Sequence, residues 1–360
     1  MLTQMIDSFG TGAVMAAGAI LIGFLFGFFA QRSRFCLRAA VIEFWHGRFG
    51  EKLSVWLLVF STAVITVQLM ALAGFLETSN ARQIASRGSL SGALIGGIVF
   101  GAGMIMTRGC ASRLLVLSAN GNMRALLSGL IFAVTAQATL AGMLAPLREM
   151  ISAWWTIEGG YSRDLLARLG LGHGGGLVFG LVWAFAALYF VRKSPSRTFW
   201  MWVGGIGTGL MVAAAWGFSQ WVANTSFDPV QIQGITFSGP SAEWLMRVVS
   251  QPTPKLGFEF GILPGVFLGS AVGACWGKDF KLEGFGGSYT MPRYIIGAIC
   301  MGFGSMLAGG CAVGAGVTGG AIFAVTAWLT LLGMWIGAGL TDRLMDAPKK
   351  KEQNPVTPQP

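Results

Sequence analysis

Charged residues, histidines and cysteines are all scarce in this sequence, and each shortage excludes a class of function. Only 11% of the 360 residues are charged, whereas a soluble domain carries about 25%. The chain has two histidines, His46 and His173, and no CxxC pair. A tetrahedral metal site would depend on scattered cysteines, so we expect neither a metal nor a cofactor. No GxxxxGK[ST] motif occurs, which argues against direct coupling to ATP.

Apolar residues and glycine are abundant instead. Apolar residues account for 54% of the sequence, and there are 54 glycines. Nine apolar runs approach the roughly 20 residues that a helix needs to cross the hydrocarbon core of a bilayer. The sequence therefore predicts an all-α membrane protein with about nine transmembrane helices, at roughly 12–30, 53–75, 91–107, 124–145, 172–191, 199–221, 258–276, 292–308 and 321–341.

The basic residues lie between these runs or at their edges, and this placement predicts the orientation. The net charge is +10, but its position is typical of membrane topology and not of nucleic-acid binding. The connections on the side that holds the C-terminus carry 18 Lys and Arg residues, and the opposite side carries 7. The positive-inside rule places the N-terminus outside and the C-terminus in the cytoplasm. The Lys- and Pro-rich tail, 347–360, is expected to be disordered.

Two segments of the chain repeat one another 201 residues apart. IGGIVFGAGMIMTRGCASRLLV (95–116) aligns with IGAICMGFGSMLAGGCAVGAGV (296–317), and nine of the 22 positions are identical. In the predicted topology the two copies cross the membrane in opposite directions. We therefore expect one transport domain with inverted, pseudo-symmetric halves, an arrangement that places a transporter's site near the midplane. The domain is expected over 1–346, with four-span halves at about 12–145 and 199–341 and a linking span at 172–191.

A Gly-Cys-Ala sequence ends the span in each copy: Gly109-Cys110-Ala111 and Gly310-Cys311-Ala312. Glycine adopts the backbone angles that stop a helix. We expect Cys110 to open a short helix over 111–119, and the Gly-rich segment after Cys311 to form an irregular loop. Such backbone is tolerated at membrane depth only where it is buried in protein or lines a cavity. The two segments are therefore predicted to re-enter the membrane and meet near its midplane.

The chemistry of these breaks suits an anion. Free N–H groups at a helix start carry positive potential, and a thiol adds a weak donor and a soft, polarisable acceptor. Cys110 and Cys311 therefore suit a sulfur-containing anion better than sulfate, and Arg113 is the cation most suited to draw it inward. Two alternatives are packing as small hydrophobes, which Cys275 and Cys300 inside apolar runs also fit, and a Cys110–Cys311 disulfide or other thiol-redox role.

The motifs resemble those of the YeeE/YedE family of membrane sulfur transporters, whose characterised members import thiosulfate. The resemblance covers nearly all of 14–341 and is carried by QRSRFCL (31–37) and the two repeat copies. It implies an hourglass-shaped protein of the bacterial cytoplasmic (inner) membrane in which three cysteines relay the thiosulfate ion through thiol hydrogen bonds. Those cysteines fall on Cys36, Cys110 and Cys311. The resemblance also implies a TusA-like cytoplasmic sulfurtransferase as a partner.

The first copy departs from the family's frequent AGGCATG pattern. It reads TRGCASR, with Arg108 and Arg113 where the family has glycine. Transport of another sulfur or selenium anion is therefore an alternative to thiosulfate. A membrane thiol oxidoreductase is the enzyme alternative, but it would need paired reactive thiols and usually a quinone or CxxC partner. The sequence favours a transporter over an enzyme.

Overall fold

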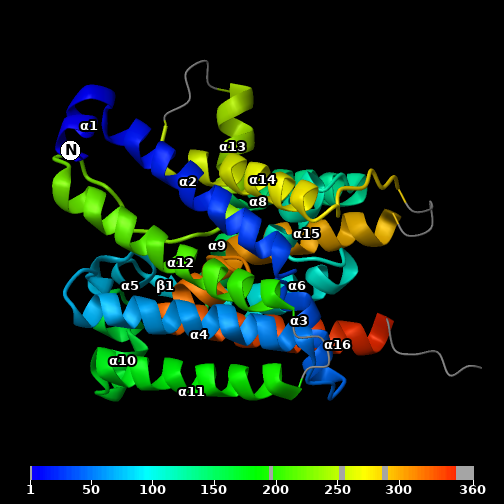
Figure 1. The fold of residues 1–360 in the computed structure, drawn as a ribbon. Helices are drawn as coiled ribbons and strands as arrows, with labels where there is room; N and C mark the ends of the chain where they lie inside the picture. The colour runs from blue at the N-terminus through cyan, green and yellow to red at the C-terminus, as the bar shows by residue number, and fades with distance from the viewer. Residues whose placement is uncertain (1, 194–197, 251–255, 286–290, 346–360) are drawn as a thin grey trace, which may run out of the picture.

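Long helices dominate the computed structural model, which describes residues 2–193, 198–250, 256–285 and 291–345 (Figure 1). A helix occupies each of the nine predicted runs. Eight helical segments in the described residues are long and apolar enough to cross a membrane, which confirms an all-α, multi-pass membrane protein. The long helices are α2 (Thr11–Arg32), α4 (Glu51–Leu72), α6 (Leu90–Met106), α8 (Met123–Ala141), α11 (Gly172–Lys193), α12 (Phe199–Thr225), α14 (Phe258–Trp276), α15 (Met291–Ala308) and α16 (Val325–Met345).

Helix α16 is the one long helix in the described residues that is not among these eight segments. Its 21 residues reach about 32 Å at roughly 1.5 Å per residue, which is enough to span the hydrocarbon core. Asp342 and Arg343 near its end lower its hydropathy. The predicted tail, 347–360, lies outside the described residues.

Short elements fill the connections between the long helices. Two of them, α3 and α7, begin directly after a cysteine, at Cys36 and Cys110. The expected helix over 111–119 is confirmed. The short elements are α1 (Leu2–Phe9), α3 (Leu37–Trp45), η1 (Thr78–Asn80), α5 (Arg82–Ala85), β1 (Gly88–Ser89), α7 (Ala111–Ala119), α9 (Ala145–Ala153), β2 (Thr156–Ile157), η2 (Gly160–Arg163), α10 (Leu165–Leu169), α13 (Ser238–Ser250) and η3 (Gly314–Gly319).

The long helices pack in crossing pairs drawn from distant parts of the sequence. Helix α2 lies along α14 and α12, and α4 lies along α12 and α11. Helix α6 lies between α15 and α16, while α8 packs on α15. Helix α11 sits at one side of the bundle (Figure 1) and exposes Val178, Val182 and Phe185. That exposed apolar face is what a helix needs when its neighbour is lipid.

Glycines bring two of these pairs into backbone contact. A Cβ added to Gly27 of α2 would lie 2.2 Å from the carbonyl oxygen of Val266 in α14. A Cβ added to Gly101 of α6 would lie 2.4 Å from the carbonyl oxygen of Met334 in α16. Small residues are favoured where membrane helices approach this closely, because association there depends on van der Waals contact. We call these two the interlocked helix pairs.

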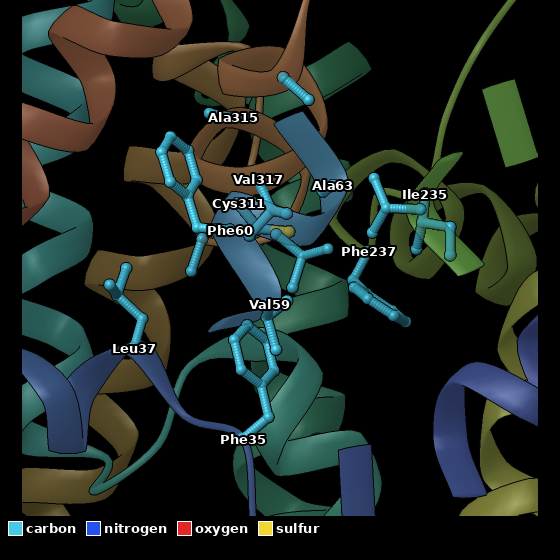
Figure 2. Packing of buried hydrophobic residues seen from close by; sticks show 14 of the residues in the cluster. Phe35, Leu37, Val59, Phe60, Ala63, Ile235, Phe237, Cys311, Ala315 and Val317 are labelled. Atoms are coloured by element: carbon cyan, nitrogen blue, oxygen red, sulfur yellow. The ribbon is translucent and has the colours of Figure 1, made fainter. Parts of the chain in front are cut away.

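The centre of the bundle is filled by a continuous apolar cluster. Figure 2 shows Cys311 among aromatic and branched side chains from several elements, including Phe237 and Phe35. The cluster also contains Cys110, so both repeat cysteines lie in one core. Cys275 departs from the predicted packing role, because it is exposed on α14. We call this central cluster the apolar waist; its fully buried members include Phe26, Phe60, Phe100, Met104, Leu114, Trp216, Ile235 and Phe237.

Candidate functional site

Two of the predicted cysteines meet at the starts of two short helices. Cys36 is the N-cap residue of α3, and Cys110 is the N-cap residue of α7. Their thiols lie near each other, and the Cys110 sulfur lies 3.3 Å from the Ser112 hydroxyl. Cys110 is buried, while Cys36 is half-buried. Two helix N-termini therefore converge on one thiol pair, and the unpaired N–H groups at such ends favour a negative charge.

Arg113 supplies a cation to this thiol pair. Its guanidinium interacts electrostatically with both Cys36 and Cys110. Its Nη1 donates to the Gln31 side-chain oxygen at 3.5 Å, which holds the arginine against the end of α2. The sequence placed Arg113 one turn after Cys110, and α7 turns the side chain back toward the thiols. We call Cys36, Cys110 and Arg113 the inner site.

Cys311 occupies a different local structure. It follows the end of α15, where Gly309 has a φ of +76° and Gly310 N–H donates to Ser305 O at 2.9 Å. The expected irregular loop is wrong, because a π-helical turn, η3, follows and is entirely buried. The N–H of Gly314 donates to the Cys311 sulfur at 3.4 Å. The wider π turn lets a glycine-rich segment satisfy its backbone groups internally, as a buried segment must.

Cys36 and Cys110 are near neighbours, and Cys311 shares the apolar waist with Cys110. Phe35 precedes Cys36 and points into the same cluster as Cys311 (Figure 2). All five cysteines are free, including the Cys110 and Cys311 considered for a disulfide. Gly109, Ala111, Gly310 and Ala312 are buried beside their cysteines, where they keep side-chain bulk away from the thiols.

The two copies of the repeat differ at the residue before the Gly-Cys pair. Arg108 has a φ of +59°, and Gly309 at the matching position has a φ of +76°. Both residues end their helices in the left-handed region, which glycine adopts without steric cost and other L-residues do not. Arg108 therefore has a strained backbone conformation at an exposed position. The second copy has Gly309 there, which adopts the same conformation without strain.

Replacing Arg108 with glycine is expected to stabilise the protein. The left-handed backbone costs a non-glycine residue about 1 kcal/mol, and exposed Arg108 gives up no buried contact. We expect Arg108→Gly to raise the thermal unfolding temperature in detergent, and Arg108→Ala, which keeps a Cβ, to leave it near the wild-type value. Equal effects from both variants would show that the charge, and not the backbone, sets the stability.

A polar pocket of about 240 Å³ opens on the other side of the Cys311 segment. Gly309 and Gly314 form part of its wall, and Arg82, Arg87 and Arg163 give it three cations. Arg87 Nη2 donates to Thr156 Oγ1 at 2.9 Å, across the small β1–β2 ladder. We call this cavity the outer pocket; its remaining wall comes from Gln83, Ser86, Gly88, Ser89, Leu307, Ala308, Ala315, Thr326 and Ala327.

Arg163 is the most deeply placed of these cations, with only 6% of its surface exposed. Its guanidinium donates to the carbonyl of Ser86 and, at 2.6 Å, to Thr326 Oγ1. Its Nε is buried without a hydrogen-bond partner in the described residues. Burial lowers the pKa of Arg163 to about 10, so the group remains charged at neutral pH. A buried, charged donor with spare capacity is suited to an anion.

Sequence reasoning missed Arg163 entirely. It lies in η2, inside the connection between α8 and α11, and no motif surrounds it. The connection also holds Arg148 and Arg168, so no signal in the sequence singled out Arg163. Contact between that connection and the end of α15 depends on tertiary packing, which a single sequence does not reveal.

These features define the class of protein. Long apolar helices enclose two cation-bearing sites, one that contains two thiols and one that lies beside Cys311, and this arrangement is typical of a membrane transporter. Comparison with known proteins then identifies the family. The sulphur transport family model matches residues 32–340, and the chain belongs to that family. The resemblance indicated by the cysteine motifs is thereby confirmed.

Two relatives align over almost their whole length. The thiosulfate transporter TsuA of Spirochaeta thermophila is 28% identical over 353 residues, an alignment covering 90% of this chain and 98% of that protein. The thiosulfate transporter TsuA of Escherichia coli is 22% identical over 359 residues, covering 91% of this chain and 94% of that protein. The similarity therefore includes both repeat copies and the connections between them.

Proposed function

We propose that this protein imports thiosulfate across the bacterial cytoplasmic membrane, relaying the anion past Cys311, Cys110 and Cys36. The observation that carries the proposal is that each of two cation-bearing sites has a buried repeat cysteine in it or beside it: Cys110 in the inner site, and Cys311 beside the outer pocket. Arg163 stands at the outer pocket, and Arg113 stands at the inner site. The names of the two aligned relatives support thiosulfate as the anion.

The relay follows from the cost of moving a doubly charged ion through a low-dielectric region. An isolated charge there loses its hydration, and the loss is offset only where donors and cations replace the water. The N-termini of α3 and α7, the Arg113 and Arg163 guanidinium groups and the thiols provide those donors and cations in short steps. Thiols are soft, weakly donating groups, so they hold a sulfur anion without trapping it.

The helix packing supports the inverted repeat. Under the 201-residue alignment, α6 corresponds to α15 and α8 to α16. The contact of α6 with α16 is matched by that of α15 with α8, and the contact of α2 with α14 by that of α12 with α4. The start of α2 and the end of α16 lie at opposite ends of the bundle (Figure 1), which supports termini on opposite sides of the membrane. The excess of Lys and Arg in the connections on the C-terminal side supports a periplasmic N-terminus and a cytoplasmic C-terminus.

A TusA-like sulfurtransferase is the proposed cytoplasmic partner. The exposed Arg34 and Arg108 lie close in sequence to the inner cysteines, at the end of the path where the anion is released. A partner that binds and consumes the imported sulfur there would keep the net flow inward. Addition of such a protein to the inner side should accelerate uptake without changing the apparent affinity for external thiosulfate.

Uptake of labelled anions by cells that express the protein tests the function. We expect uptake of thiosulfate labelled at the outer sulfur, inhibited by excess unlabelled thiosulfate and little affected by equal sulfate. Selenosulfate and sulfite form the other arms, because Arg108 and Arg113 depart from the family pattern. Preferential uptake of the selenium anion would replace thiosulfate as the substrate, and no uptake above empty-vector cells would reject the proposal.

A further inference from the structure

Two buried hydroxyl groups lie where the chain enters α13. Thr236 and Ser238 are 9% and 4% exposed, and their oxygens are 3.4 Å apart. A hydroxyl offers one donor and two acceptor lone pairs. A single long hydrogen bond between the two groups leaves most of that capacity unused, although buried hydroxyls are normally satisfied.

The Thr236 hydroxyl lies against the segment that follows Cys311. A Cβ added to Gly314 would fall 2.4 Å from Thr236 Oγ1, so the hydroxyl packs directly on that glycine. The N–H of Gly314 donates to the Cys311 sulfur, and Gly314 also lines the outer pocket. Gly314 therefore contacts the Thr236 hydroxyl and the Cys311 thiol and also lines the outer pocket, from which the anion would arrive.

The position of these hydroxyls is fixed by a bond between loop and turn. Thr318 Oγ1 in η3 donates to the carbonyl of Ile235 at 2.6 Å. The residue next to Thr236 is thereby held to the same π turn that carries Gly314. The hydroxyl and the Cys311 segment are one rigid unit, and packing of both against the apolar waist (Figure 2) prevents them from separating.

The inner site shows the same combination of groups. The Cys110 sulfur lies 3.3 Å from the Ser112 hydroxyl, in the first turn of α7. A hydroxyl thus accompanies a repeat cysteine on each side of the waist, although the hydroxyls come from different local structures. Thiosulfate has two unlike ends, a soft terminal sulfur and three hard oxygens. A thiol is suited to the first and a hydroxyl to the second.

We infer that Thr236, supported by Ser238, binds the oxygen-bearing end of the anion while Cys311 faces its terminal sulfur. Thr236 is then a specificity-determining residue that orients the ion as it leaves the outer pocket. The inference rests on the proposed function, because it assigns the orientation of the same anion. It predicts discrimination against sulfate, whose four equal oxygens would leave the thiol without a soft partner.

Replacing Thr236 with valine tests this role, because valine keeps the shape and removes the hydroxyl. We expect the KM for thiosulfate uptake to rise about tenfold, the effect of one lost hydrogen bond to a charged group, with the maximal rate retained. Thr236→Ser should restore the wild-type KM. Thr208→Val is the matched control, since the fully buried Thr208 hydroxyl bonds within α12 to Gly204 O at 2.6 Å.

A second variant covers the case in which Thr236→Val fails to reach the membrane. Ser238→Ala removes the supporting hydroxyl, and we expect a two- to threefold rise in KM. If Thr236→Val and Ser238→Ala both kept the wild-type KM while Cys110→Ala and Cys311→Ala were inactive, the proposed orientation of the anion would be rejected. The cysteine relay would still be supported. Normal uptake in the cysteine variants would overturn the relay itself.

Discussion

Replacing Cys110 with alanine is expected to abolish growth on thiosulfate as the sole sulfur source while the protein remains in the membrane. Cys110 lies near the Cys36 thiol and 3.3 Å from the Ser112 hydroxyl. Alanine fills much of the same space but offers no donor. Loss of one interaction with a charged group costs about 1.5–3 kcal/mol, so we expect labelled uptake to fall at least tenfold.

The same experiment separates the three thiol positions from the other cysteines. Cys36→Ala and Cys311→Ala should behave like the Cys110 variant, whereas Cys275→Ala and Cys300→Ala should transport normally. Cys110→Ser keeps a donor but replaces a soft atom with a hard one, and we expect partial activity. Undiminished uptake in the Cys110 and Cys311 variants would reject the relay and return both residues to a packing role.

Replacing Arg163 with methionine is expected to give the second-largest loss of uptake. The change keeps the length of the stem but removes the buried charge, and it leaves Ser86 O and Thr326 Oγ1 without their donor. We expect the KM for thiosulfate to rise about ten- to a hundredfold, since charged hydrogen bonds contribute about 1.5–3 kcal/mol. Arg163→Lys should keep part of the affinity, because its charge persists without the planar fork.

Arg168→Met provides the control for this prediction. Arg168 lies five residues away on α10, and it is exposed. It therefore contributes to any general attraction of anions to this face but not to the outer pocket. If both methionine variants raised the KM equally, long-range electrostatics would account for the effect, and Arg163 would have no binding role.

The sequence was sufficient to predict the parts of the fold that depend on local composition. Each apolar run of roughly 20 residues became a helix, because the bilayer leaves the backbone no other way to satisfy its hydrogen bonds. The helix after Cys110 was also predictable, since ASRLLVLSA has good helix formers between a glycine and Asn120-Gly121. The glycine-rich copy after Cys311 was not, because no propensity scale anticipates a π turn sustained by burial.

The site was only partly predictable for a related reason. The repeat identified Cys110 and Cys311, and the spacing along α7 identified Arg113. The proximity of Cys36 to Cys110 depends on how α3 and α7 converge in space. Arg163 comes from a connection without periodic pattern, and it reaches the path because residues of α5, η2 and η3 line one pocket. Thr236 reaches the path because the neighbouring Ile235 is bonded to Thr318 of η3.

The interlocked helix pairs restrict how transport can proceed. At Gly27 and Gly101 the main chains of neighbouring helices are in contact. The carbonyl oxygens of Val266 and Met334 occupy the space that a side chain at these two positions would need. Sliding or tilting one helix against its partner would drive peptide groups into each other. We therefore expect the scaffold to stay still during a transport cycle, while rotation of a few side chains in the waist opens and closes the way. In such a protein, access would be controlled by side-chain rotation within a rigid pore and not by rigid-body rocking of one half against the other.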